Sequence, residues 1–283
     1  MARAEPPPAS YRYDDADVDR LLRLVWGDSI SFGIYDDAAE PIEVATARTR
    51  ARMALPLSLE PRQTVLEVAC GFATTARFLA REYGCRVTAT NLSERQLESA
   101  RAATEADGLS SLIAFEAADY HALPFADATF DVWWCQDAVV HSGDKGRVIA
   151  EAHRVLKPGG YAVLTEQLMR HGTMSTAERA RFAERYDTEQ LWDEGEYVGA
   201  FAEAGFRLNA VEDWTPHLAR HSLKLCHRAE RLIAETNLEL DPTVVEKSLG
   251  SWRLKVEQAA VGKLGWGFFL AQALSRSDAN RRH

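Results

Sequence analysis

The chain has 283 residues, of which 46% are hydrophobic, and it carries a formal net charge of -9 at pH 7. This length and composition suffice for one large α/β domain, or for a core domain with an elaborated cap. The negative charge disfavours nucleic-acid binding through phosphates, which requires clustered lysine and arginine.

The N-terminal part of the chain precedes the first core strand. Residues 1–10 contain three consecutive prolines and are expected to form a disordered tail. Helical spacing of apolar residues between Leu21 and Trp26 predicts a first helix, and a second is expected from Ile42 to Ala54. The N-terminus has no apolar signal segment, and no apolar run is long enough to span a bilayer. We therefore expect a cytoplasmic protein without a membrane partner.

Strand and helix signals alternate in the next part of the chain, residues 56–166, which we expect to be the core domain. A helix capped by Ser93 should follow the second strand, and another should begin at about Asp144. This alternation implies a parallel, doubly wound α/β sheet, whose ligands bind at the carboxyl ends of the strands. The expected strands are Thr64–Cys70, Arg86–Thr90, Leu112–Glu116, Phe130–Cys135 and Tyr161–Thr165, with a turn at Lys157–Gly160 before the last.

The pattern loosens after Glu166. Residues 167–260 are expected to form a substrate cap together with the remaining core elements, and residues 261–283 a final strand and tail. Within the cap, residues 167–193 read as a mobile or helical insertion, and residues 215–260 are helical and amphipathic. The four cysteines form no close Cys-x-x-Cys pair, so we expect them to be reduced core residues and expect no metal site.

The segment VLEVACGFATTARFLA, residues 65–80, combines an apolar strand, a turn of small residues and a helix start. This order resembles the first motif of the Rossmann-like S-adenosylmethionine (SAM) methyltransferases, in which an acidic residue precedes Gly-x-Gly-x-Gly. Glu67 is the acidic residue and Gly71 the middle glycine, whereas Ala69 and Ala73 occupy the flanking positions. Alanine is small enough for this turn if its φ stays negative.

The resemblance implies a SAM site built from residues at the ends of successive strands. Gly71 would let the backbone approach the ligand closely, and Glu67 would orient the turn or receive the ammonium group. Asn91 would face the ribose hydroxyls, and Asp119 the adenine amino group. The candidate cofactor-binding residues are Glu67, Ala69, Cys70, Gly71, Asn91, Leu92, Asp119, Tyr120, Gln136 and Trp26.

Further motifs extend the resemblance over nearly the whole chain. Residues 154–160, RVLKPGG, match a methyltransferase turn, and residues 13–35, 134–145 and 262–267 resemble the sarcosine/dimethylglycine methyltransferases. The resemblance implies a mostly parallel seven-stranded sheet and an N-terminal helical lid, residues 11–55, that folds over the cofactor. The chain differs from the family at Ser31, at Glu166-Gln167-Leu168 and in lacking one glycine of Trp-Gly-Gly, and these departures fall where the substrate is chosen.

The acceptor of the methyl group therefore stays open at this point. It is an amine of the sarcosine or dimethylglycine type, or a carbon of an isoprenoid diphosphate or polyketide-like molecule; alternatively, the protein binds SAM but does not methylate. Glu166 is the leading candidate for a catalytic base and His141 the second. The candidate substrate-binding residues are Phe32, Tyr197, Trp214, His217 and Arg170. We expect a small-molecule substrate of secondary metabolism, no nucleic-acid partner, and a monomer or homodimer.

Overall fold

The computed structural model of the protein describes residues 13–170, 172–186, 188, 191–235 and 239–275, and residues 1–10 with their predicted disorder lie outside this part. Within it, seven strands form one sheet in the order β3-β2-β1-β4-β5-β7-β6, in which β7 runs antiparallel to both of its neighbours. The predicted doubly wound, mostly parallel sheet is therefore confirmed. The strands are β1 (Thr64–Glu67), β2 (Arg86–Asn91), β3 (Ile113–Ala117), β4 (Phe130–Gln136), β5 (Leu156–Met169), β6 (Phe206–Asp213) and β7 (Leu264–Ala273).

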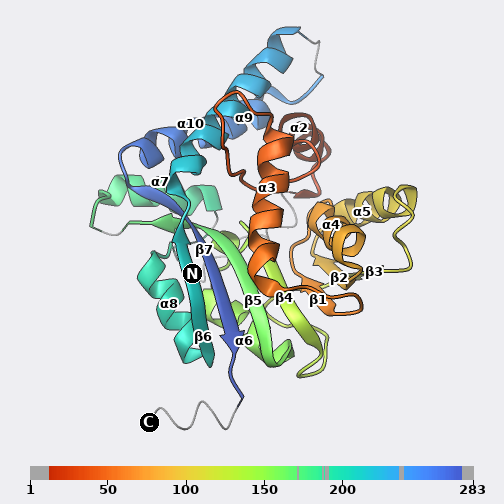
Figure 1. Cartoon of the computed structure of the whole chain (residues 1–283). Coiled ribbons are helices and arrows are strands. Elements are labelled where there is room, and N and C mark those ends of the chain that lie inside the picture. Colours follow the sequence, from red (N-terminus) through yellow and green to blue (C-terminus); the bar gives the residue numbers. More distant parts are fainter. Residues whose placement is uncertain (1–12, 171, 187, 189–190, 236–238, 276–283) are drawn as a thin grey trace, which may run out of the picture.

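Helices cover both faces of the sheet, and a group of helices stands at one end of it (Figure 1). On one face, apolar residues of α4 and α5 join the N-terminal helices in a single hydrophobic core. On the other face, α6 and α8 pack over a second core. The helices are α2 (Ala16–Trp26), α3 (Ile42–Ala54), α4 (Thr74–Tyr83), α5 (Glu94–Ala106), α6 (Lys145–Val155), α7 (Thr176–Tyr186), α8 (Glu194–Glu203), α9 (Thr215–Glu235) and α10 (Pro242–Ala260).

The sheet order reverses between β1 and β4, and this switch point is where a parallel sheet of this kind binds its ligands. From β1 the chain moves outward to β2 and β3, and it then returns to β4 on the other side of β1. Figure 1 shows α2, α9 and α10 grouped at one end of the sheet, although α2 lies far from the other two in the sequence. The packing of α2 with α9 and α10 thus joins the two ends of the chain.

Most predicted strand boundaries lie within one residue of the observed ones, except at β1, which ends at Glu67 instead of Cys70, and around β5. The strand extends from Leu156 to Met169, so the predicted turn at Lys157–Gly160 is an irregularity at its start, where the register with β4 shifts. The predicted insertion after Glu166 first continues β5 and then forms α7. Ser93 caps α5 as predicted, because its Oγ accepts a hydrogen bond from Gln96 N at 3.2 Å.

Three further observations apply to the described residues. None of their helices combines the length and the apolar character needed to cross a bilayer. No group of three or more histidine, cysteine, aspartate or glutamate side chains among them could hold a metal ion. All four cysteines are buried and form no disulfide, and Cys85 and Cys135 are fully enclosed in the core.

Candidate active site

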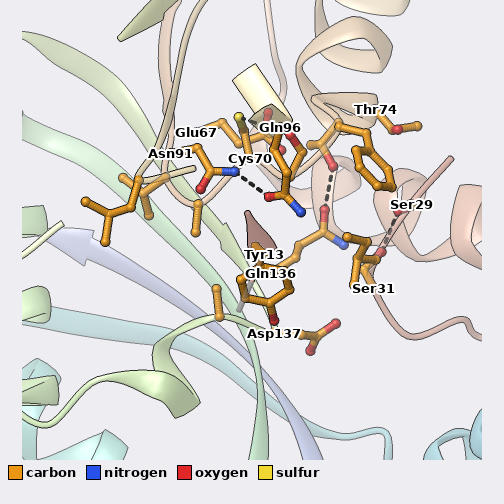
Figure 2. Close-up of a pocket in the computed structure, with 18 of the residues that line it drawn as sticks. Tyr13, Ser29, Ser31, Glu67, Cys70, Thr74, Asn91, Gln96, Gln136 and Asp137 are labelled. Carbon is orange, nitrogen blue, oxygen red and sulfur yellow. Dashed lines mark hydrogen bonds between the residues drawn. The ribbon is translucent and has the colours of Figure 1, made fainter. Parts of the chain in front are cut away.

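A first cavity lies at the carboxyl ends of β1, β2 and β4, against the start of the described chain (Figure 2). Residues 28–31 and Tyr13 of the N-terminal segment form one side of it. Asp14 holds that segment at the rim, because its Oδ1 accepts a hydrogen bond from Ser93 Oγ at 2.6 Å. Of the predicted cofactor-binding residues, those that line the cavity are Glu67, Ala69, Cys70, Gly71, Asn91, Leu92, Tyr120 and Gln136.

The loop between β1 and α4 turns through three residues with positive φ. Ala69, Gly71 and Ala73 have φ angles of 51°, 53° and 52°, in the left-handed region that glycine enters readily and alanine does not. The expectation that the two alanines keep a negative φ is therefore wrong. Among the described atoms, a Cβ added at Gly71 would meet only Ile30 Cδ1, at 4.0 Å, so the space beside Gly71 belongs to the cavity.

Glu67 ends β1 and is buried against the first turn of α4. Its Oε2 accepts a hydrogen bond from Ala76 N at 3.0 Å. Burial raises the pKa of this carboxyl to about 8, although its hydrogen bonds and the nearby Arg50 favour the charged form. A cation that entered the cavity beside Glu67 would also favour the carboxylate. The side chain is therefore suited both to orient the loop and to receive an ammonium group.

Two amide side chains whose Nε2 atoms are buried, Gln136 and Gln96, line the first cavity. Gln136 Oε1 accepts hydrogen bonds from Thr75 Oγ1 at 2.7 Å and from Trp134 Nε1 at 3.0 Å. Gln96 Oε1 accepts one from Asn91 Nδ2 at 2.8 Å (Figure 2). Neither Nε2 atom has a hydrogen-bond partner within the described part of the chain. Buried donors without partners are uncommon in folded proteins, so both amides fit a ligand that brings acceptor atoms into the cavity.

The other predicted cofactor residues, Asn91, Asp119 and Trp26, do not all line the first cavity. Asn91 ends β2 on the wall of the first cavity. The carboxylate of Asp119 is turned to His121, since its Oδ1 accepts a hydrogen bond from His121 N at 2.9 Å and lies 2.7 Å from Nδ1. Tyr120, the next residue, lines the cavity, whereas Asp119 does not. An adenine contact of Asp119 thus stays a prediction, and Trp26 lines the second cavity instead of the first.

A second cavity, of about 760 Å³, adjoins the first. Its wall combines apolar side chains, such as Trp26 of α2 and Trp252 of α10, with charged ones, such as Arg181 and Lys247. Phe32, predicted to bind substrate, also lines it. The volume lies within the range of about 300–1,000 Å³ that is typical of small-molecule sites.

The two cavities meet at four residues that line both of them: Tyr13, Ile30, Asp137 and His141. His141 Nε2 lies 3.4 Å from Tyr13 OH, and the His141 ring packs edge-on against Tyr186 with the ring centroids 5.5 Å apart. An imidazole in this place can take a proton from a molecule in the second cavity. The junction is therefore where a reaction between two bound molecules would occur.

Asp137 is a residue of the junction that the sequence does not single out. Its carboxylate accepts hydrogen bonds from Phe32 N at 3.0 Å and from Trp266 Nε1 at 2.7 Å, and thus ties the N-terminal segment to β7. Its φ of 54° is unusual for a residue with a side chain. Burial raises the pKa of the carboxyl to about 6. The one signal in the sequence is its position directly after a buried strand.

Glu166, the leading candidate base, lines neither cavity in the described structure. Its Oε2 accepts a hydrogen bond from Val140 N, and its Oε1 accepts one from Gln167 N, both at 2.8 Å. Gln167 lines the second cavity, because successive side chains of a strand point to opposite faces. Of the two predicted catalytic residues, His141 alone is therefore in a position to contact bound molecules.

The aromatic residues predicted to bind substrate fall into two groups. Phe32 lines the second cavity, whereas Tyr197 and Trp214 line neither of the two cavities. Tyr197 of α8 is fully buried, with its ring centroid 5.3 Å from that of Phe269. Trp214 stacks on Phe268 with centroids 4.8 Å apart. Both therefore contribute to the hydrophobic core in this structure.

The polar residues predicted to bind substrate, His217 and Arg170, also lie outside both cavity linings. His217 Nδ1 accepts a hydrogen bond from Tyr35 N at 3.2 Å. Arg170 forms an ion pair with Asp213 at 3.2 Å, and both side chains are about half exposed. Their contact with a substrate stays a prediction that the geometry does not favour.

Comparison with known proteins gives consistent matches. Residues 66–164 match a family described as a methyltransferase domain. The sarcosine/dimethylglycine N-methyltransferase of Halorhodospira halochloris is 32% identical over 91% of this chain and 92% of its own length. The 27-O-demethylrifamycin SV methyltransferase of Amycolatopsis mediterranei is 31% identical over 86% of this chain and 90% of its own length.

Two more matches differ in how much of the other protein they cover. The glycine/sarcosine/dimethylglycine N-methyltransferase of Actinopolyspora halophila is 33% identical over 92% of this chain, but the chain spans only 46% of that protein. A crystal structure from Galdieria sulphuraria, assigned provisionally as a sarcosine dimethylglycine methyltransferase, superposes with a TM-score of 0.86 at 26% identity. That superposition covers 93% of this chain and 98% of the other.

Proposed function

The chain belongs to the SAM-dependent methyltransferases, and on this basis we propose that it methylates a hydroxyl group of a largely apolar small molecule that is larger than a glycine derivative. The observation that carries the proposal is the second cavity, of about 760 Å³, which meets the first at His141. Bound SAM would supply the electrophilic sulfonium methyl group. The β1–α4 loop, Glu67, Gln96 and Gln136 would hold SAM in the first cavity.

The size and lining of the second cavity support an acceptor of drug-like size. Dimethylglycine would leave most of the volume unfilled, although charged side chains such as Arg181, Glu184 and Lys247 also line it. The Amycolatopsis relative, named a 27-O-demethylrifamycin SV methyltransferase and aligned over 86% of this chain, also supports an acceptor of this class.

His141 is the residue best placed to take the proton of the acceptor hydroxyl. An oxygen nucleophile usually needs a base, and a positioned imidazole contributes about 10²–10⁴-fold to such a reaction. His141 lines both cavities, as does Tyr13, whose OH lies 3.4 Å from His141 Nε2. Tyr13 and Ile30 would therefore limit the access of water and keep the two bound molecules aligned.

An amine of the sarcosine or dimethylglycine type is the second candidate acceptor. The relatives that are 32% and 33% identical carry that activity in their names, and an unprotonated amine needs no base. Arg181 and Lys247 in the second cavity could pair with its carboxylate. Carbon methylation with Glu166 as the base has less support, because both of its carboxylate oxygens accept backbone hydrogen bonds outside the cavities.

The test is S-adenosylhomocysteine (SAH) production with three acceptors: 27-O-demethylrifamycin SV, geranyl diphosphate and dimethylglycine. We expect turnover with 27-O-demethylrifamycin SV and a loss of at least about 10²-fold in the His141→Gln variant. Turnover of dimethylglycine that His141→Gln leaves unchanged would contradict the proposal and support the amine. SAM binding by calorimetry without SAH production from any acceptor would favour a protein that binds SAM but does not methylate.

A further inference from the structure

The short turn that carries His141 is held by buried polar groups on both sides. Glu166 Oε2 accepts a hydrogen bond from Val140 N at 2.8 Å. Lys145 Nζ donates to the carbonyl oxygens of Val140 at 3.2 Å and of Ser142 at 2.7 Å. Both Glu166 and Lys145 are almost completely inaccessible to solvent. Hydrogen bonds in such an environment are stronger than in water, because water does not compete for the groups.

This turn needs external support. It is a single 3₁₀ turn, Val139–His141, between the end of β4 and the start of α6, and so short an element makes few hydrogen bonds of its own. Ser142, the residue after it, is fixed further by His121 Nε2, 2.7 Å from its Oγ, and by Thr188 Oγ1, which donates to its carbonyl oxygen at 3.2 Å. The backbone is therefore bound immediately before and after His141.

We propose that Glu166 and Lys145 are positioning residues that fix the backbone on either side of His141 and thereby hold its imidazole at the junction of the two cavities. The inference rests on the proposed role of His141 as the base. It also gives Glu166 a function that needs no contact with the reacting atoms. Tyr13 and Tyr186 complete the support from the ring side, through the contacts described above.

The chemistry of Glu166 fits this role closely. Its two oxygens accept hydrogen bonds from Val140 N and from Gln167 N, so both oxygens are needed as acceptors. Glutamine would direct an NH₂ group at one of these N–H groups and would break that contact. Burial raises the pKa of Glu166 and lowers that of Lys145, while the attraction between the two charges opposes both shifts.

The decisive test is NMR of the histidine side chains in the SAH-bound protein, which does not depend on the identity of the acceptor. The signals of His141 are assigned by their loss in His141→Gln. We expect Glu166→Gln and Lys145→Met each to shift these signals, with SAH affinity within about twofold of the wild type, because neither residue lines the first cavity. Val163→Ala is the matched control, since Val163 is a fully buried residue of the same strand.

Turnover gives the second readout, measured with whichever of the three acceptors above is methylated. We expect Glu166→Gln to lower kcat by about 10²-fold, the effect of a displacement of about 1 Å at a reacting group. In the His141→Gln background, the same change should add less than about threefold, because residues that act through one another are not additive. Lys145→Met tests the carbonyl side of the turn if Glu166→Gln does not fold.

Each outcome tests either the positioning role of Glu166 and Lys145 or the role of His141 as the base. Unchanged His141 signals in Glu166→Gln and Lys145→Met would overturn the positioning role, as would an equal shift in Val163→Ala. A full additional loss of kcat in the His141→Gln background would show that Glu166 acts independently. If His141→Gln retains full turnover while Glu166→Gln still shifts the imidazole signals, the proposed base fails but the positioning of the ring stands.

Discussion

Replacement of Ala69 by glycine should stabilise the free protein. Ala69 is held at a φ of 51°, where a residue with a Cβ pays roughly 1–2 kcal/mol. Glycine removes this strain but loses about 0.5–1 kcal/mol more conformational entropy on folding. The difference is a gain of about 0.7 kcal/mol for Ala69→Gly. In a chain of this size, it corresponds to an increase in Tm of about 2 °C.

The same reasoning predicts different effects for substitutions at Ala73 and Gly71 in the same loop. Ala73 has a φ of 52°, but its side chain is fully buried. Loss of a buried methyl group costs about 0.8 kcal/mol, so Ala73→Gly should leave stability almost unchanged. Gly71→Ala should destabilise by about 0.7 kcal/mol, the reverse of Ala69→Gly. The new methyl group at Gly71 would point into the first cavity, so this variant should also lose SAM binding.

The assay is urea denaturation of the wild type and the three variants without ligand, followed by calorimetry with SAM. The slope of unfolding free energy against urea should be the same in all four proteins, so that changes in midpoint report stability. A decrease in stability for Ala69→Gly of more than about 0.5 kcal/mol would refute the strain argument. Wild-type SAM affinity in Gly71→Ala would refute the assignment of the first cavity to the cofactor.

Three further predictions concern single side chains. Asp119→Ala should lower SAM affinity about tenfold, as measured by calorimetry. Asp119→Asn should lower it less, because asparagine can keep the hydrogen bond from His121 N. Equal SAM affinity in the wild type and both variants would exclude an adenine contact of Asp119. Burial lowers the pKa of His221 to about 3, so the unfolded chain binds the proton first and stability is lost as pH falls below about 6.5. Between pH 7 and pH 5 the wild type should therefore lose about 2 kcal/mol more than His221→Gln in urea titrations. His141→Gln should lower kcat by at least about 10²-fold with a hydroxyl acceptor, and an unchanged kcat would locate the base elsewhere.

The cavity that we propose for the cofactor could be predicted because it is built from local sequence. A strand, a turn and a helix bring Glu67, Ala69 and Gly71 to one edge of the sheet, and the next strand adds Asn91. Parallel strands place their carboxyl ends together, so chain order alone gives the neighbourhood. The backbone conformation of Ala69 could not be predicted in the same way, because its φ depends on how the loop packs against α4 and the N-terminal segment.

The candidate catalytic residues were harder to predict, because successive side chains of a strand point to opposite faces. The sequence correctly places Glu166 near the carboxyl end of β5, but one step along a strand reverses the direction of the side chain. Gln167 lines the second cavity, whereas Glu166 turns to the backbone of Val140. Which of these two side chains points into the cavity depends on the neighbouring strands and cannot be predicted from the local sequence. Asp137 was missed for a related reason, since its contacts to Phe32 and Trp266 come from distant segments.

In our proposal the second cavity binds the acceptor, and its residues come from distant parts of the sequence. Trp26 of α2 and Trp252 of α10 meet with ring centroids 6.5 Å apart, and each helix alone shows only the apolar stripe of any packed helix. Two of the departures from the sarcosine/dimethylglycine pattern fall on cavity walls, because Ser31 lines the first cavity and Gln167 the second, whereas Glu166 lines neither. The changes at Ser31 and Gln167 therefore support the proposal of a different acceptor.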